Sequence, residues 1–118
     1  MDDLFSAASR TDTPQPQDNV LTVSQLSNQL RFTVEKQFNR VAVEGEISSL
    51  KRAASGHVYF SLKDDDSVLN AIVWRSAAER IKAPFEDGLH VVAYGKLTTY
   101  GARSNYQIII DRMEPAGL

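Results

Sequence analysis

Residues 57–63 alternate strictly between apolar and polar side chains, and this alternation constrains the fold more than any other feature of the sequence. Successive side chains of a β-strand point to opposite faces, so the pattern predicts a strand with one apolar and one polar face. The apolar set is Val58, Phe60 and Leu62, and the polar set is His57, Tyr59, Ser61 and Lys63. Turn-forming residues 64–67 follow, and a second strand over 68–74 can continue the apolar face. The sequence therefore predicts a β-hairpin whose aromatic and basic outer face suits unpaired nucleic acid.

Five further segments are predicted to be regular. Apolar residues at three- and four-residue steps predict an N-terminal helix, whose apolar stripe we expect to pack on the sheet. Thr22 and Gln25 have the spacing of a capping box at its start. Gly45, inside the next strand, predicts a bend that lets one long strand pair with two neighbours. The predicted segments are helix 22–37, strand 41–51, helix 76–82 with Ser76 as its N-cap, strand 89–99 and strand 104–113.

This order of elements predicts a mainly β fold. It matches a five-stranded antiparallel OB-fold barrel with a helix between strands 3 and 4, preceded here by an N-terminal helix. SH3-like barrels share the strand count, so the pattern leaves that alternative open. Residues 21–118 then form one domain, and the polar residues 1–20 form a tail that we expect to be disordered. A docking role for this tail is the alternative.

Charge is nearly balanced, with 13 basic and 15 acidic residues and a net charge of −2. Residues 1–20 hold four of the acids and one of the bases, which leaves the predicted domain at +1. Attraction to nucleic acid should therefore be modest and must depend on where the cations lie. The chain has no cysteine, no long apolar run and no secretion signal, so we expect a cytoplasmic protein without a membrane span.

The candidate binding residues follow from the predicted barrel. OB-folds bind oligonucleotides on the face of strands 2 and 3, between the loops that follow strands 1 and 4. Aromatic and basic residues of this chain fall in or beside those places. They are Lys51, Arg52, His57, Tyr59, Lys63, Trp74, Arg75, Lys96, Tyr100, Arg103 and Tyr106. Trp74 either stacks on a base or, if a bulge reverses the alternation, fills the end of the barrel.

No catalytic or metal-binding set is predicted. Glu44 and Glu46 share a strand face without a further ligand at suitable spacing, and His57 and His90 lie on different strands. Cysteine, the Gly-x-Ser-x-Gly motif and a phosphate loop are all missing from the sequence. We expect no cofactor and weigh three binding functions above an independent enzyme: single-stranded DNA, RNA, or docking of a partner subunit.

Several motifs identify a family. They are Val-Glu-Gly-Glu-Ile-Ser (43–48), Ser-Gly-His-Val-Tyr-Phe-Ser-Leu-Lys-Asp (55–64), Trp-Arg (74–75), Tyr-Gly-Lys (94–96) and Tyr-Gln-Ile-Ile-Ile (106–110). Together they resemble the N-terminal OB-fold domain of the exodeoxyribonuclease VII large subunit over about residues 20–118. The family often has Phe where this chain has Trp74, which keeps an aromatic ring.

The resemblance implies a role in a nuclease that degrades single-stranded DNA from both ends to oligonucleotides. In that family the large subunit joins several small subunits, and its OB-fold domain grips the DNA. The catalytic region follows the segment 113–117 and is expected to be absent here, along with the region that binds the small subunit. No catalytic residue is carried over, and the family does not strictly need a divalent metal.

Overall fold

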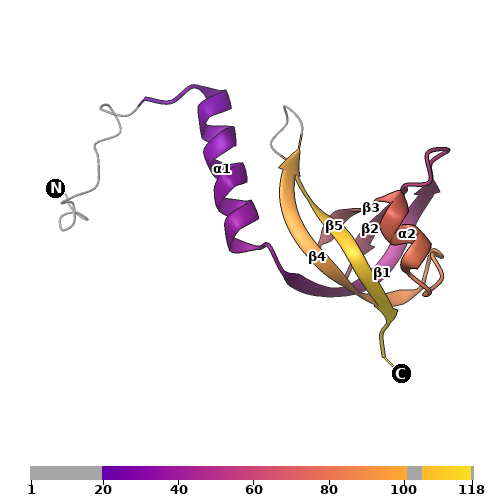
Figure 1. The fold of residues 1–118 in the computed structure, drawn as a ribbon. Helices are drawn as coiled ribbons and strands as arrows, with labels where there is room; N and C mark the ends of the chain where they lie inside the picture. Colours follow the sequence, from indigo (N-terminus) through magenta and orange to yellow (C-terminus); the bar gives the residue numbers. More distant parts are fainter. Residues whose placement is uncertain (1–19, 101–104, 118) are drawn as a thin grey trace.

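The computed structural model describes residues 20–100 and 105–117. The predicted tail, apart from Val20, and the turn at 101–103 lie outside these residues. The elements are α1 (Val23–Gln37), β1 (Val41–Arg52), β2 (Val58–Lys63), β3 (Val68–Val73), α2 (Arg75–Arg80), β4 (His90–Tyr100) and β5 (Asn105–Pro115) (Figure 1). Their order confirms the predicted plan, and the strand boundaries differ from the prediction by one or two residues.

The five strands close into a barrel in the order β1-β2-β3-β5-β4. Four of the strand pairs are antiparallel, but β3 and β5 are parallel, which corrects the prediction of a purely antiparallel barrel. The physical reason is the strand number, since an odd number of strands cannot alternate in direction all the way around a closed ring. The closed barrel with α2 between β3 and β4 has the OB-fold plan.

Strand β1 is shared between two neighbours, as the glycine predicted. Residues 41–46 pair with β4, and Glu46 to Arg52 pair with β2. The change of partner occurs beside Gly45, where a Cβ atom would lie 3.2 Å from the carbonyl oxygen of Lys63. A larger residue at this position would push the β2–β3 hairpin away from β1 at the point where β1 changes partner.

A β-bulge later in β1 decides which side chains face outward. The register shifts by one residue between Ser48 and Lys51, and Ser49 has a positive φ of 58°. The extra residue reverses the alternation. Leu50 consequently packs against the core, and Lys51 stands opposite Tyr59 on the outer face.

The barrel interior is filled by side chains from every strand. Ile47, Val73, Val91, Ile108 and Ile110 are all fully buried. In β2 the inward residues are buried and the outward residues are not, which confirms the alternation predicted for the hairpin. Such a core supplies most of the favourable free energy of folding.

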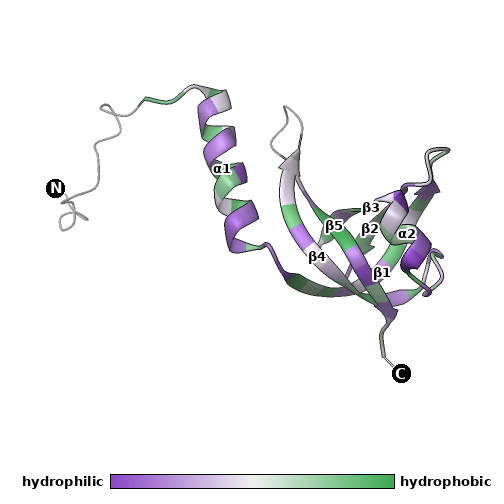
Figure 2. Cartoon of the chain, viewed as in Figure 1, coloured by the Kyte–Doolittle hydropathy of each residue, from purple (hydrophilic) through white to green (hydrophobic). Residues whose placement is uncertain are grey.

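Helix α1 stands beside the barrel and contributes nothing to this core (Figure 1). Its capping box is present as predicted, with Thr22 and Gln25 exchanging hydrogen bonds of 2.9 and 3.0 Å. The expectation that its apolar stripe packs on the sheet is wrong. Leu26 and Leu30 are each 48% exposed, and the helix packs mainly beside β4, where Thr98 donates a hydrogen bond to Glu35. Figure 2 shows apolar residues along α1, which stands beside the barrel.

Helix α2 begins one residue earlier than predicted. Its N-cap is Trp74 rather than Ser76, and no side chain caps it. Trp74 therefore lies at the junction of β3 and α2, outside the strand to which the sequence assigned it. Ala77 of α2 is buried at this end of the barrel, with Phe85 from the following loop.

Candidate nucleic-acid interface

The outer face of β2 and β3 carries the most suitable aromatic side chain for stacking. Tyr59 is 40% exposed and lies between Lys51 of β1 and Ile72 of β3 in the sheet. Ile72 points away from the barrel core but is only 4% exposed, so neighbouring side chains cover it. The phenol can thus offer its ring to a base while Lys51 meets a phosphate.

Trp74 stands at the end of the same face, where His57 supports it. The two rings meet edge to face, with centroids 4.7 Å apart and an angle of 82° between their planes. The indole is 43% exposed and does not belong to the core, so it does not fill the barrel end. This arrangement leaves part of the tryptophan surface open to a ligand.

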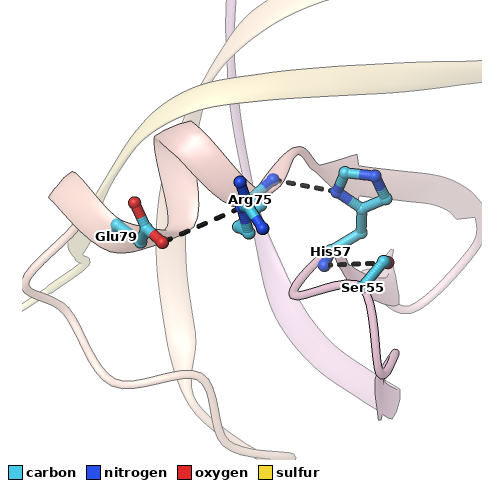
Figure 3. A network of polar contacts seen from close by, with 4 residues as sticks. All are labelled: Ser55, His57, Arg75 and Glu79. Carbon is cyan, nitrogen blue, oxygen red and sulfur yellow. Dashed lines mark hydrogen bonds and ion pairs between the residues drawn. The ribbon is translucent and has the colours of Figure 1, made fainter.

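His57 is held by hydrogen bonds to Ser55 and Arg75 (Figure 3). Its Nδ1 accepts a hydrogen bond of 2.9 Å from the backbone N–H of Arg75, and the backbone N–H of His57 donates to the Ser55 hydroxyl at 3.5 Å. Because Nδ1 accepts, the ring proton of the neutral imidazole is assigned to Nε2. His57 thus joins the loop after β1 to the start of α2 and orients Trp74.

Gly56 makes this junction possible. It has a φ of +96°, and a Cβ atom there would lie 2.6 Å from the side-chain carbons of Arg75. The arginine stem therefore lies against the glycine backbone, and its guanidinium pairs with Glu79 at 3.9 Å. Arg75 is held near the indole but shares its charge with a carboxylate.

The remaining cations of the face differ in availability. Lys51 and Lys63 are exposed and have no ion-pair partner among the residues that the structure describes, although Glu46 stands opposite Lys63. Arg52 instead donates to the carbonyl oxygen of Phe85 at 2.9 Å and lies 5.7 Å from that ring's centroid. It holds the loop before β4 in place.

The turn between β2 and β3 fixes the far end of the face. Asp64 accepts hydrogen bonds of 2.9 Å from the backbone N–H groups of Asp66 and Ser67. These two bonds lower the pKa of the Asp64 carboxyl below its usual value of 3.8. The turn is therefore held by a charged acceptor at neutral pH.

Of the remaining sequence-predicted residues, one lies at the far end of the face, one lies on another strand, and two fall wholly or partly outside the described residues. Tyr106 is 58% exposed at the far end of the face, where it lines an apolar pocket of about 400 Å³ with Lys63 and Phe38. Lys96 lies on β4, which is not a neighbour of β2. In the closed ring β1 lies between them on one side, and β3 and β5 lie between them on the other. Tyr100 ends β4, but its side chain and the whole of Arg103 lie outside the described residues.

Sequence reasoning missed three residues with suitable chemistry. Arg40, Tyr94 and Arg112 line a cleft of about 490 Å³ on the outer face of β4 and β5. Arg112 lies 3.9 Å above the centroid of Tyr94. No sequence pattern shows this pairing, because it depends on a bulge in the register of two strands.

The described residues hold neither a cluster of metal-ligating side chains nor a helix that could span a membrane. No group of three or more His, Asp or Glu side chains comes together there. The sheet does bring His90 to 3.0 Å from Glu44, but this pair is exposed and stands alone. No helix of the described residues is long and apolar enough to cross a membrane.

Comparison with protein families agrees with this geometry. Residues 21–114 match the family described as OB-fold nucleic acid binding domain. This chain belongs to that family. The match covers the whole barrel together with α1, so the OB-fold face of β2 and β3 is the expected ligand surface.

Curated proteins of the family that the sequence motifs resemble are similar to this chain. The exodeoxyribonuclease 7 large subunit of Erythrobacter litoralis is 46% identical over 117 residues, which is 99% of this chain and 24% of the relative. The protein of the same name from Mesorhizobium japonicum is 53% identical over 97 residues, or 81% of this chain and 19% of the relative. The chain thus spans about a quarter or less of these relatives.

Solved OB-folds share the architecture at low sequence identity. A replication protein A heterotrimer bound to ssDNA superposes with a TM-score of 0.54 at 18% identity, over 66% of this chain and 57% of the other. Asparaginyl-tRNA synthetase from Pyrococcus horikoshii gives 0.52 at 13% identity, over 66% and 20%. These likenesses establish the fold.

Proposed function

We propose that this OB-fold binds single-stranded DNA as the DNA-gripping part of an exodeoxyribonuclease VII large subunit. The observation that carries the proposal is the pair of half-exposed rings on one face, Tyr59 on β2 and Trp74 supported by His57. Every base has a face on which an aromatic ring can stack, so the face tolerates many sequences. Lys51 and Lys63 then meet the phosphates, with Arg75 contributing less because Glu79 shares its charge.

The whole subunit would degrade single-stranded DNA from both ends to oligonucleotides, together with its small subunit in the cytoplasm. The similarity to the large-subunit relatives supports this wider role. The chain presented here would contribute binding and no catalysis. Purified free of other nucleases, it should leave end-labelled single-stranded DNA intact, and steady shortening of the label would contradict the binding-only role.

The central test replaces the two rings one at a time. Tyr59→Ala and Trp74→Ala should each weaken binding of an oligothymidylate by about 1–3 kcal/mol, the value of one stacked base. This corresponds to about 5- to 150-fold in Kd. The thermal midpoint should change little, because both rings are outside the core. Phe32→Ala is the matched control, since it removes an exposed ring on α1 away from the face.

Intrinsic fluorescence gives an independent reading, because Trp74 is the only tryptophan. Stacking should quench its emission when the oligothymidylate is added. Unchanged emission together with full affinity of Trp74→Ala would remove this residue from the interface.

Three further measurements complete the test: the salt dependence of binding, competition between DNA and RNA, and a pull-down. Three to five phosphate contacts predict a slope of log K against log salt of about −2 to −3.5, at about −0.7 per phosphate. A slope near zero would exclude the phosphate contacts.

Competition between matched DNA and RNA oligomers decides the alternative of an RNA-binding module, and clear preference for RNA would overturn the proposal. Docking of a partner subunit is tested by a pull-down with the small subunit.

A further inference from the structure

A second cationic cleft lies on the side of the barrel formed by β4 and β5. Its volume is about 490 Å³, within the range of pockets that hold small ligands. Three cations line it, Arg40 from the α1–β1 connection, Lys96 from β4 and Arg112 from β5. Asp111 is the one acidic residue in its lining. The cleft therefore carries an excess of positive charge in a chain that is otherwise nearly neutral.

A bulge in β5 builds the aromatic wall of this cleft. Tyr94 pairs with Arg112 and Gly95 pairs with Ile110, so Asp111 is the extra residue. The bulge turns Arg112 over the tyrosine ring, with its guanidinium carbon 3.9 Å from the ring centroid. At Gly95 a Cβ atom would lie 1.9 Å from the carbonyl oxygen of Ile109, so only glycine permits this approach of the strands.

The charges in the cleft are available to a ligand. Arg40 and Lys96 are exposed and have no ion-pair partner within the described residues. Arg112 pairs with Glu114 at 3.1 Å, and its side chain remains 62% exposed. The adjacent Tyr94, helped by Glu114, raises the pKa of Arg112. Guanidinium planes stack on unpaired bases, so Arg112 can accept a base on the side away from Tyr94.

One lateral row of paired residues connects the cleft to the β2–β3 face. Lys51 pairs with Tyr59, Tyr59 with Ile72, Ile72 with Ile109, and Ile109 with Lys96. Each residue comes from the next strand of the barrel, and a lysine stands at both ends. At about 4.8 Å per strand the four steps cover roughly 19 Å. Ile109 lines the cleft, and the buried Ile72 lies beneath the surface between the two cationic regions.

We propose that this cleft is a second binding site for single-stranded nucleic acid, which follows the row from Tyr59 around β3 and β5 to Lys96. The proposal rests on the function proposed above and extends it. A base would stack on Arg112, and the phosphates beside it would contact Arg40 and Lys96. A short oligomer would occupy only the β2–β3 face, and a longer one would reach the cleft as well.

The test compares two oligothymidylates, of about 4 and about 12 nucleotides, both within the range that single OB-folds bind. The double variant Arg40→Gln with Lys96→Gln should weaken the longer oligomer about threefold to tenfold, as expected for two exposed charge contacts. Its salt slope should become shallower by about 1.4. The short oligomer should bind as it does to the unchanged chain. Lys82→Gln is the control for losing a positive charge elsewhere on the surface, because that lysine is exposed and outside the cleft.

Tyr59→Ala separates the failure of this inference from failure of the proposed function. It should weaken both oligomers, whereas the double variant should weaken only the longer one. If the unchanged chain binds neither oligomer, the proposed function fails. If it binds both and the double variant matches Lys82→Gln on each, the cleft is not a nucleic-acid site. Equal weakening of both oligomers by the double variant also overturns the inference.

Discussion

The barrel and helix α1 have equally regular apolar patterns, yet only the barrel buries them. The inward residues of β2 are 2–4% exposed, whereas Leu26 and Leu30 of the helical stripe are each 48% exposed. The barrel is a closed ring in which each strand pairs with two others, whereas α1 packs mainly beside one strand, β4. An amphipathic pattern therefore predicts whether a segment forms a strand or a helix. How much that segment contributes to the free energy of folding depends on how many neighbouring elements cover its apolar side chains.

The largest expected effect comes from truncating the barrel core. Ile108→Ala should destabilise the chain by about 2–5 kcal/mol, because Ile108 is fully buried and the cavity cannot collapse in a closed ring. Chemical denaturation with circular dichroism measures the change. A loss as small as that of an exposed helix residue would contradict the difference between the two regions.

The next effect concerns backbone contact within the barrel. Gly95→Ala should destabilise by about 1–3 kcal/mol, since its Cβ meets the carbonyl of Ile109 and the strands must move apart. Thermal unfolding measures this loss. Gly88→Ala is a control for added volume, because a Cβ there meets nothing within 4 Å, although its φ of +89° adds backbone strain. A Gly95→Ala protein of unchanged stability would rule out the close approach of β4 and β5.

A smaller effect is expected at the start of α1. Thr22→Ala removes the capping box and should destabilise the helix by about 1 kcal/mol. The loss should remain local, because no residue of α1 is buried. Hydrogen exchange should become faster in 23–37 and stay unchanged in the strands. Faster exchange throughout the barrel would show that the two regions unfold together.

Truncation of the helical stripe should have less effect still. Leu30→Ala should change the global stability by no more than about 0.5 kcal/mol, the usual range for exposed positions. Denaturation under the same conditions as for Ile108→Ala gives a direct comparison. A loss of several kcal/mol would mean that the stripe is covered in solution, by a second copy or another surface.

The smallest expected difference between the barrel and α1 is in their sensitivity to acid. The folded pKa of Asp64 lies below 3.8, so its contribution to stability is present above that pH and lost as the pH falls through the folded pKa. The cap of α1 uses the uncharged Thr22 and Gln25 and should not respond. An NMR titration of the Asp64 carboxyl measures the pKa, and a value at or above 3.8 would contradict the two backbone hydrogen bonds. Asp64→Ala should remove this part of the acid sensitivity.

Local patterns determined much of this protein. The alternation at Val58, Phe60 and Leu62 specified the hairpin and its polar face, because a strand's two faces follow from backbone geometry alone. The capping box fixed the start of α1 in the same way, through contacts within one turn. Gly45 correctly indicated the point where β1 changes partner.

Tertiary structure decided what depends on register and on closure of the ring. The bulge at Ser49 turned Lys51 outward, and the bulge at Asp111 placed Arg112 over Tyr94, although neither residue type signals a bulge in the sequence. Closure by an odd number of strands made β3 and β5 parallel and built the row that links the two cationic regions. Each of these features arises where distant segments meet. Sequence periodicity describes only neighbours along the chain, so it cannot specify them.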